Sequence, residues 1–363
     1  MMSEKSKKHV DSCRFCWMCH HICPVGNATG LERNTARARA LGLSLVNRET
    51  IALSEVIDNI YECACCGACV KECVTGWDPV MFTKEARLTA AMEGALPEYI
   101  SVLVDNCLET GNAYGMKEVD AALAETMSRH GEKTDVLLFL GVDATYKVPA
   151  AAINAIRVLE KAGVRFTVLA NEPASGQQLE YLISAANETR EQMEACAKEL
   201  NTFAKVVVFD PQDAKVFKRE YKEWGVELTP EVVTFTAYTA ELIKTGALGA
   251  VNTGKAVVYQ DPFQLSRDLG ETAEAREVIN AYAVCNEMLC CGKDTMWAGN
   301  LLMKEWMPDV MLRVASDRIN NAKGVKADTI VTASVSEYAS LKAVAQDEVK
   351  IISLEELILD NMK

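Results

Sequence analysis

The pattern of hydrophobic and polar residues changes near residue 133. Beyond that point, short continuous apolar runs alternate with longer segments in which apolar residues recur at helical spacing. We interpret the runs as buried strands, which cover residues 135–141, 165–170, 205–210, 255–260, 329–333 and 349–353. Two of the helical segments cover residues 150–162 and 213–224. Strands that alternate with helices predict an α/β body with a mostly parallel sheet.

The body also contains a weak internal similarity. Residues 207–218 resemble residues 330–342, since each segment has an apolar strand, a short turn and then a helix, with polar residues at the same offsets. Repetition of one such unit is typical of a duplicated fold. We therefore expect two related halves, about 133–225 and 226–363.

The chain before residue 133 has a helical pattern. Apolar residues recur at helical spacing within residues 24–62 and again within 84–132, where residues 109–115 form a turn between helices. We expect an α-helical domain over 1–95, a helical linker over 96–132 and the α/β body over 133–363. The expected fold class is therefore α+β overall.

The composition narrows the possible functions. The 363 residues include 38 Lys and Arg against 51 Asp and Glu, a net charge of −13. An acidic chain is a poor candidate for binding nucleic acid or an anionic membrane. No apolar stretch reaches the roughly 18 residues of a transmembrane span, and residues 1–10 lack the apolar run of a secretory signal. We expect a cytoplasmic protein with reduced thiols, in which spaced cysteines bind metal.

Nine of the fourteen cysteines lie between residues 13 and 73, in two runs with the spacing C-x2-C-x2-C-x3-C. This spacing is typical of bacterial ferredoxins with two [4Fe-4S] clusters, in which the fourth cysteine of each run binds the other cluster. The predicted ligands are Cys13, Cys16, Cys19 and Cys73 for cluster 1, and Cys63, Cys66, Cys69 and Cys23 for cluster 2.

Structural zinc is the alternative for these thiols, but zinc favours paired C-x2-C units with a longer gap between them. Cys65 lies out of register with the second run, and we expect a buried thiol or one that contacts a ligand. Between the runs, Arg37 and Arg39 are candidates for offsetting the negative charge of a buried cluster. An exposed helix face is the alternative for either arginine.

This arrangement resembles the iron–sulfur subunits of the heterodisulfide reductase D, anaerobic glycerol-3-phosphate dehydrogenase C and glycolate oxidase F type. The resemblance includes the eight cysteines and the segments 35–39, 111–115, 259–267 and 290–292. It implies an N-terminal dicluster ferredoxin domain followed by two CCG domains, whose cysteines can hold unusual iron–sulfur clusters in the family. It also implies a role in anaerobic metabolism.

The body departs from that family at nearly every CCG cysteine. The aligned positions carry Val142, Ala174-Ser175-Gly176, Asp210, Asp213, Phe263, Ser334 and Glu337, while Cys290 and Cys291 are retained. Two adjacent thiols are too few for a [4Fe-4S] cluster, and carboxylates are poor ligands for one. A third cluster would need Cys196 and Cys285 to fold nearby. We expect instead degenerate CCG domains whose strand-end carboxylates are solvated.

These observations predict a subunit that relays single electrons through two [4Fe-4S] clusters and catalyses no reaction by itself. By resemblance, its partner in a hetero-oligomeric complex is a flavoprotein dehydrogenase or another iron–sulfur redox subunit, docked on the body. One alternative is a stand-alone thiol/disulfide reductase that uses Cys290 and Cys291. Another is a structural or oxidant-sensing protein whose clusters only stabilise the small domain.

Overall fold

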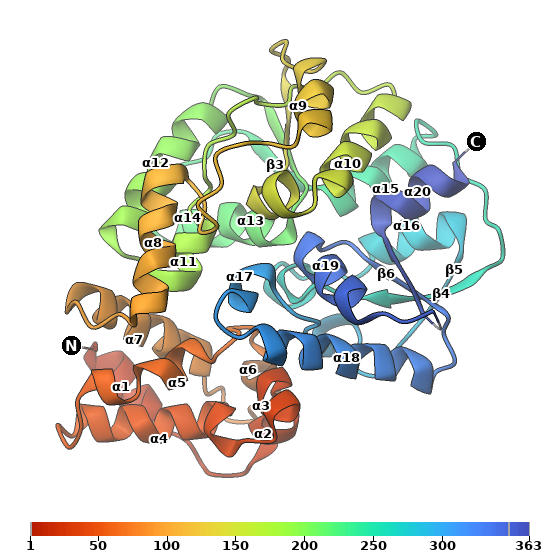
Figure 1. Cartoon of the computed structure of the whole chain (residues 1–363). Helices are drawn as coiled ribbons and strands as arrows, with labels where there is room; N and C mark the ends of the chain where they lie inside the picture. Colours follow the sequence, from red (N-terminus) through yellow and green to blue (C-terminus); the bar gives the residue numbers. More distant parts are fainter. Residues whose placement is uncertain (1, 348, 363) are drawn as a thin grey trace.

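The computed structural model describes residues 2–347 and 349–362, and Figure 1 shows a helical N-terminal part packed against a larger body. Helix α7 begins where Asp78 accepts from Val80 N at 2.9 Å and from Met81 N at 3.0 Å, with Pro79 in the first turn. The helices before the body are α1 (Glu4–Val10), α2 (Met18–His21), α3 (Pro24–Thr29), η1 (Glu32–Asn34), α4 (Ala36–Asn47), η2 (Leu53–Glu55), α5 (Ile57–Tyr61), α6 (Ala68–Glu72), α7 (Pro79–Met92), α8 (Glu98–Thr110) and α9 (Ala121–Ser128).

The body contains two parallel sheets, so a mixed fold with parallel pairing is confirmed. The first sheet has the order β1 (Val136–Phe139), β2 (Lys205–Val208), β3 (Glu231–Thr234). The strand predicted over 165–170 is wrong, because this segment forms only an isolated bridge in the described structure, from Thr167 to Leu137. Its Val168 N–H donates to the carbonyl of His130 at 2.9 Å, which takes the segment out of the ladder.

The second sheet has the order β5 (Val284–Asn286), β4 (Ala256–Gln260), β6 (Thr329–Thr332), β7 (Lys350–Ser353). The two sheets are separated between β3 and β4, later in the chain than the boundary that we expected near residue 225. They share a plan. In each, the first strand of the half (β1 or β4) pairs on one side with the next extended segment (Thr167 or β5) and on the other with a later strand (β2 or β6).

Helices connect the strands and cover both sheets (Figure 1). They are α10 (Pro149–Lys161), α11 (Gln177–Ile183), α12 (Asn187–Leu200), α13 (Pro211–Lys215), α14 (Tyr221–Glu223), α15 (Phe235–Lys244), α16 (Glu274–Tyr282), η6 (Gly292–Asp294), α17 (Leu301–Lys304), α18 (Pro308–Gly324), α19 (Val335–Val344) and α20 (Leu354–Asn361). Three π-helical turns, η3 (Asp143–Lys147), η4 (Val216–Glu220) and η5 (Gln264–Asp268), interrupt this pattern. Such turns are frequent at functional sites.

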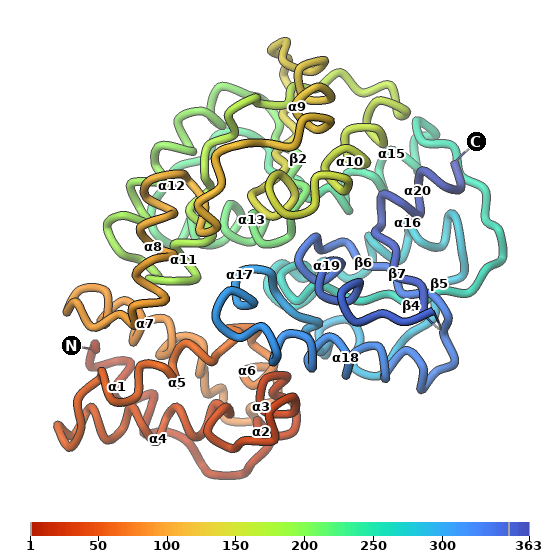
Figure 2. The backbone as a smooth tube through the Cα atoms, viewed as in Figure 1, coloured from red at the N-terminus to blue at the C-terminus, as the bar shows by residue number. Residues whose placement is uncertain are grey.

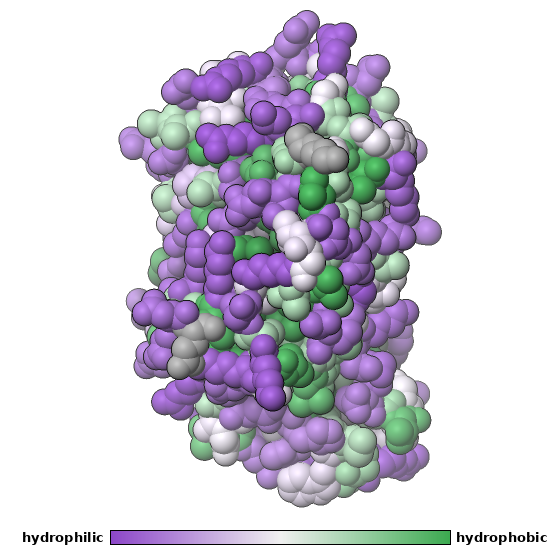
Figure 3. All heavy atoms as spheres, turned by 90° about the vertical axis from the view of Figure 1, so that its right-hand side faces the viewer, coloured by the Kyte–Doolittle hydropathy of each residue, from purple (hydrophilic) through white to green (hydrophobic). Residues whose placement is uncertain are grey.

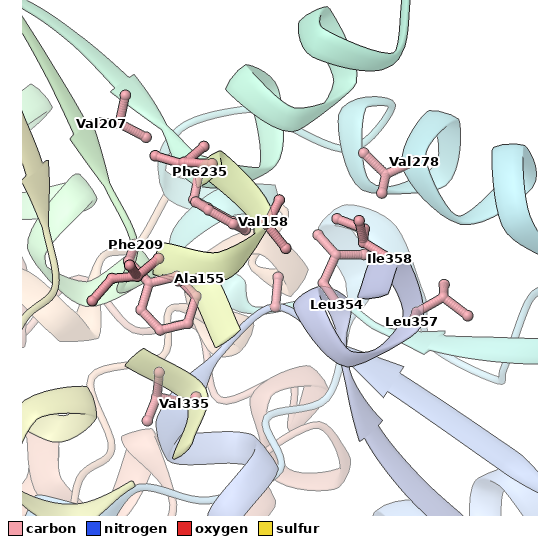
Figure 4. Packing of buried hydrophobic residues seen from close by; sticks show 14 of the residues in the cluster. Ala155, Val158, Val207, Phe209, Phe235, Val278, Val335, Leu354, Leu357 and Ile358 are labelled. Atoms are coloured by element: carbon pink, nitrogen blue, oxygen red, sulfur yellow. The ribbon is translucent and has the colours of Figure 1, made fainter. Parts of the chain in front are cut away.

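The main hydrophobic core joins the two halves of the body. Figure 4 shows Ala155 and Val158 of α10 between Phe209, which follows β2, and Ile358 of α20. Each of these side chains is at most 4% exposed. One core therefore fixes the two sheets relative to each other.

The chain termini lie on opposite sides of the molecule. Figure 2 places the N-terminus beside the helical part and the C-terminus on the far side of the body. The face seen in Figure 3 is mostly hydrophilic, with scattered apolar residues. Within the described residues, no helix combines the length and the apolar character needed to cross a bilayer.

Candidate metal centre

The two cysteine runs fold into turns with the same backbone conformation. The residues that flank the second cysteine are left-handed in both runs, with φ of 55° and 69° at Phe15 and Trp17, and 50° and 72° at Cys65 and Gly67. This conformation is uncommon outside glycine. In each turn it directs a backbone N–H, that of Phe15 or Cys65, at the Sγ of the first cysteine, 3.4 Å away. Equivalent turns suit the binding of equivalent groups.

Helices α2 and α6 follow these turns and pack against each other. Each leads to a fourth cysteine. Cys23 caps α3, where its Sγ accepts from Gly26 N at 3.4 Å. Cys73 follows α6, and its Sγ lies 3.3 Å from Thr75 Oγ1. The two runs thus lie side by side, as an exchange of fourth ligands requires.

The four thiols predicted for cluster 2 form a buried group. Cys23, Cys63 and Cys66 are at most 9% exposed, and Cys69 is partly buried. The charge of Cys69 interacts with those of the other three. Burial raises the pKa of Cys66 to about 11, although the charge of Arg267 opposes this rise. Cys66 therefore stays protonated at neutral pH unless a metal displaces its proton.

The four thiols predicted for cluster 1 lie nearer the surface. Cys16 is exposed, and Cys13, Cys19 and Cys73 are partly exposed. Burial and the charge of Cys13 both raise the pKa of Cys19, so these two thiols are close to each other. Across residues 2–347 and 349–362, no three His, Cys, Asp or Glu side chains converge tightly enough to hold one metal ion. A cubane is bound at its corners, so its ligands stand apart.

A buried cation lies beside the cluster 2 thiols. Arg39 of α4 is 2% exposed, and its Nε and Nη1 have no hydrogen-bond partner among the described residues. Burial alone would lower the pKa of Arg39, but the negative charges of Cys63, Cys23 and Cys69 raise it. Unpartnered donors next to a group of thiols fit an anionic iron–sulfur cluster at this site. Such a cluster, when bound, supplies one-electron redox chemistry.

The body covers the cluster 2 thiols. Arg267 donates from Nε to the carbonyl of Cys66 at 2.9 Å. Phe263, which we aligned with a CCG cysteine, packs in one apolar group with Cys23, Cys66 and Trp297. An apolar side chain thus occupies the position at which the family resemblance implied an iron ligand.

The remaining body cysteines are divided between two places. Cys290 packs against the same apolar group as Phe263, and its carbonyl accepts from Arg318 Nη2 at 2.9 Å. Cys285 and Cys291 are close enough for their charges to interact. Cys196 is buried elsewhere, in a hydrophobic cluster of the first half. The four sulfurs therefore do not gather at one site.

The strand-end carboxylates are buried, so the expectation that they are solvated is wrong. Asp210, Asp213 and Glu337 are at most 3% exposed. Burial raises the pKa of Asp213 and of Glu337 to about 8. Ser175 donates to Asp213, and Gln260 Nε2 lies 3.3 Å from Glu337 Oε1. Sequence reasoning missed this burial because an acidic residue after a strand is usually at the surface.

Sequence reasoning also missed Arg87, a fully buried residue of α7. Its guanidinium donates to the carbonyls of Cys63 at 2.7 Å, Ile60 at 3.2 Å and Tyr181 at 2.6 Å. The Tyr61 and Tyr181 ring centroids lie 4.9 Å and 4.6 Å from its Cζ. Arg87 therefore joins the second cysteine run to α11 of the body. An arginine in an amphipathic helix carries no mark of such burial in the sequence.

Known proteins share this organisation. Residues 9–77, which include all eight predicted ligands, match the family model of a 4Fe-4S dicluster domain. The D component of dihydromethanophenazine:CoB–CoM heterodisulfide reductase from Methanosarcina acetivorans is 25% identical, over 89% of this chain and 86% of that protein. The chain is an iron–sulfur protein of the heterodisulfide reductase D type.

Further relatives of this heterodisulfide reductase D type protein are also redox proteins. The B component of fumarate reductase (CoM/CoB) from Methanothermobacter marburgensis is 21% identical, over 97% of this chain and 72% of that protein. The probable iron–sulfur-binding oxidoreductase FadF of Bacillus subtilis is 24% identical, over 84% of this chain and 47% of that protein. Among solved structures, glutamate racemase RacE1 of Bacillus anthracis has a TM-score of 0.32 at 15% identity over 63% of this chain and 80% of that one.

Proposed function

We propose that the chain is the electron-transfer subunit of a hetero-oligomeric oxidoreductase complex, and that it relays single electrons through two [4Fe-4S] clusters. Residues 1–95 hold both clusters, residues 96–132 link them to the body, and the degenerate CCG body covers cluster 2 and docks partners. The proposed ligands are Cys13, Cys16, Cys19 and Cys73 for cluster 1, and Cys23, Cys63, Cys66 and Cys69 for cluster 2. Relatives that are components of heterodisulfide and fumarate reductases support this proposal.

The unequal exposure of the two sets of thiols is the observation that carries the proposal. The cluster 1 set includes the exposed Cys16, whereas Cys23, Cys63 and Cys66 of the cluster 2 set are buried beneath the body. A structural staple needs no open edge. A relay needs one site that a partner can approach and one that is protected from solvent, and the two sets supply these.

An apolar surface surrounds the exposed set. We call Phe15, Trp17, Met18 and Val74 the cluster 1 rim; each is between 39% and 82% exposed. Exposed Arg14, His20 and His21 belong to the same run, so this edge is basic although the whole chain is acidic. We infer that the rim docks a redox partner, a flavoprotein dehydrogenase or another iron–sulfur subunit, whose contact face is apolar with an acidic border.

Placing negative charge on the rim is expected to slow electron entry. The double variant Met18→Glu with Val74→Glu should lower the second-order rate of cluster reduction by reduced flavodoxin, a small acidic flavoprotein, about tenfold at low salt. The added carboxylates repel the acidic donor and break the apolar contact. Anaerobic stopped-flow absorbance measures this rate, and the iron content should stay unchanged.

Two single variants make this experiment specific. Met92→Glu, at a residue of α7 that is 78% exposed, should leave the rate within twofold of the parent value. Leu289→Glu introduces charge beside Cys290 on the body, at a residue that is 66% exposed. If Leu289→Glu slows reduction and the rim variant does not, electrons enter through the body and the proposed direction is wrong.

Removing the Arg39 charge is expected to lower the potential of cluster 2. Reduction adds an electron to an anionic centre, which a nearby buried cation favours. Such a charge contributes about 1–2 kcal/mol at an effective dielectric constant near 20, or roughly 50–100 mV for one electron. Arg39→Met should show this shift in an anaerobic redox titration followed by electron paramagnetic resonance. Arg33→Met, at an exposed arginine that pairs with Glu62, should not. Equal potentials at full iron content in parent and Arg39→Met would contradict the placement.

A further inference from the structure

A cavity of about 480 Å³ opens at the carboxyl end of β1, in the first half of the body. The linker between α8 and α9, which crosses this edge of the body in Figure 1, forms one wall. The π-helical turn η3 and residues 170–175 form the others. The carboxyl ends of parallel strands are where open α/β sheets bind small molecules, and this volume lies in the range of ligand pockets.

Two carboxyl groups lie at the inner end of this cavity. Glu172 accepts from the backbone N–H groups of Leu140 at 2.6 Å and Gly141 at 2.7 Å. Asp213 accepts from the hydroxyl of Ser175. Gly141 has φ of +88°, and a Cβ there would collide with Asp213 Oδ2. The strand therefore ends in a residue without a side chain, which allows the two carboxyl groups to approach the same point.

The surroundings leave the negative charge of this pair without a buried counter-charge. Burial raises the pKa of Glu172 to about 7 and of Asp213 to about 8, and the charges of Glu172 and Asp143 add to the rise at Asp213. Among the described residues that line the cavity, the cation is Lys117, and Lys117 is exposed in the linker. A positive charge bound between the carboxylates would offset this cost.

An unpartnered hydroxyl provides a second and independent indication of a ligand. Thr145 lines the cavity from η3 and is 6% exposed. Its Oγ1 is buried and has no hydrogen-bond partner among the described residues. A buried hydroxyl without a partner is costly, so it is expected to meet a polar group of a bound molecule. Tyr146 and Phe139 add aromatic surface to the same cavity.

We propose that this cavity binds a small organic cation that carries an ammonium group. The ammonium lies between Glu172 and Asp213, Thr145 bonds a polar group of the ligand, and the aromatic side chains contact its apolar part. An anionic ligand would meet two carboxyl groups. A bare metal ion would need a third close ligand, and no such group of side chains exists within residues 2–347 and 349–362. The site is separate from the cysteine runs, so its occupancy does not depend on the proposed electron transfer.

Three ligands with one skeleton test the charge requirement. Phenethylamine, 2-phenylethanol and phenylacetate are titrated into the full-length, iron-loaded protein by anaerobic calorimetry at pH 7.5. We expect phenethylamine to bind at least tenfold more tightly than the alcohol, and phenylacetate not to bind. Equal or tighter binding of phenylacetate would overturn the proposal, and so would no binding of phenethylamine up to 10 mM. Saturable binding of Mg²⁺ that excludes the amine would also overturn it.

Matched variants test the residues. Asp213→Asn keeps an acceptor for Ser175, and Glu172→Gln keeps the side-chain size; each should weaken phenethylamine binding at least tenfold. Glu109→Gln changes an exposed carboxylate at the rim of the cavity and should leave binding within twofold. If Asp213→Asn does not fold, Glu172→Gln and Thr145→Val carry the test. Unchanged affinity in folded Glu172→Gln would overturn the assignment, whatever the clusters do.

Discussion

Cys66→Ala is expected to lower the iron content from about eight to about four atoms per chain, because it removes one ligand of cluster 2 and spares all four of cluster 1. Electron flow through the chain should stop, since the protected end of the relay is lost. The body should stay folded, because its main core lies in the two sheets and their helices. Iron and acid-labile sulfide analysis, with turnover in the assembled complex, measures both effects.

The neighbouring residue provides the control. Cys65 belongs to the same turn, has φ of 50° and lies out of register with the run. Its side chain hydrogen-bonds that of Cys63, so Cys65→Ala removes a sulfur from the same surroundings. Cys65→Ala should retain about eight irons and most of the electron flow. If Cys65→Ala loses a cluster and Cys66→Ala keeps both, the register of the second run is wrong.

Arg87→Met is expected to destabilise the protein by about 3–5 kcal/mol, the range for removing one partner of a buried ionic group. Three carbonyls lose a donor, and two tyrosine rings lose the cation between them. The apparent melting temperature should fall by at least about 6 °C at one heating rate under anaerobic conditions. Cluster 2 should also release iron to a chelator faster, since Arg87 fixes the carbonyl of Cys63.

Arg48→Met is the matched control for Arg87→Met. Arg48 has 68% of its side chain exposed and lies 4.0 Å from Asp11. An exposed pair of this kind contributes little, so the melting temperature should change by less than about 1 °C. Equal effects of the two variants would show that Arg87 does not join the helical part to the body.

The sequence predicts the strongly patterned elements well. The strands after residues 135, 205, 255, 329 and 349 are present because each is buried and its apolar run is continuous. The strands β3 and β5 were not predicted, since they lie at sheet edges, are partly exposed and need no such run. Segment 165–170 has an apolar run but pairs elsewhere, which only tertiary structure determines.

The candidate site is predictable to the extent that spacing determines it. The two runs indicated the clusters and left Arg37 and Arg39 undecided between a cluster role and an exposed helix face. In the structure Arg39 is buried against thiols, while the Cζ of Arg37 lies 3.6 Å from the Trp17 ring centroid. Their environments differ because residues two apart on a helix face different directions. Partners from distant parts of the chain, such as Arg267, have no local pattern.

The composition of the metal centre in the anaerobically purified chain tests the central claim most directly. We expect about eight iron atoms and eight acid-labile sulfides per chain, and, after reduction with dithionite, the paramagnetic resonance of two interacting [4Fe-4S] clusters. Colourless protein that contains zinc and gives no resonance signal after dithionite would contradict the account.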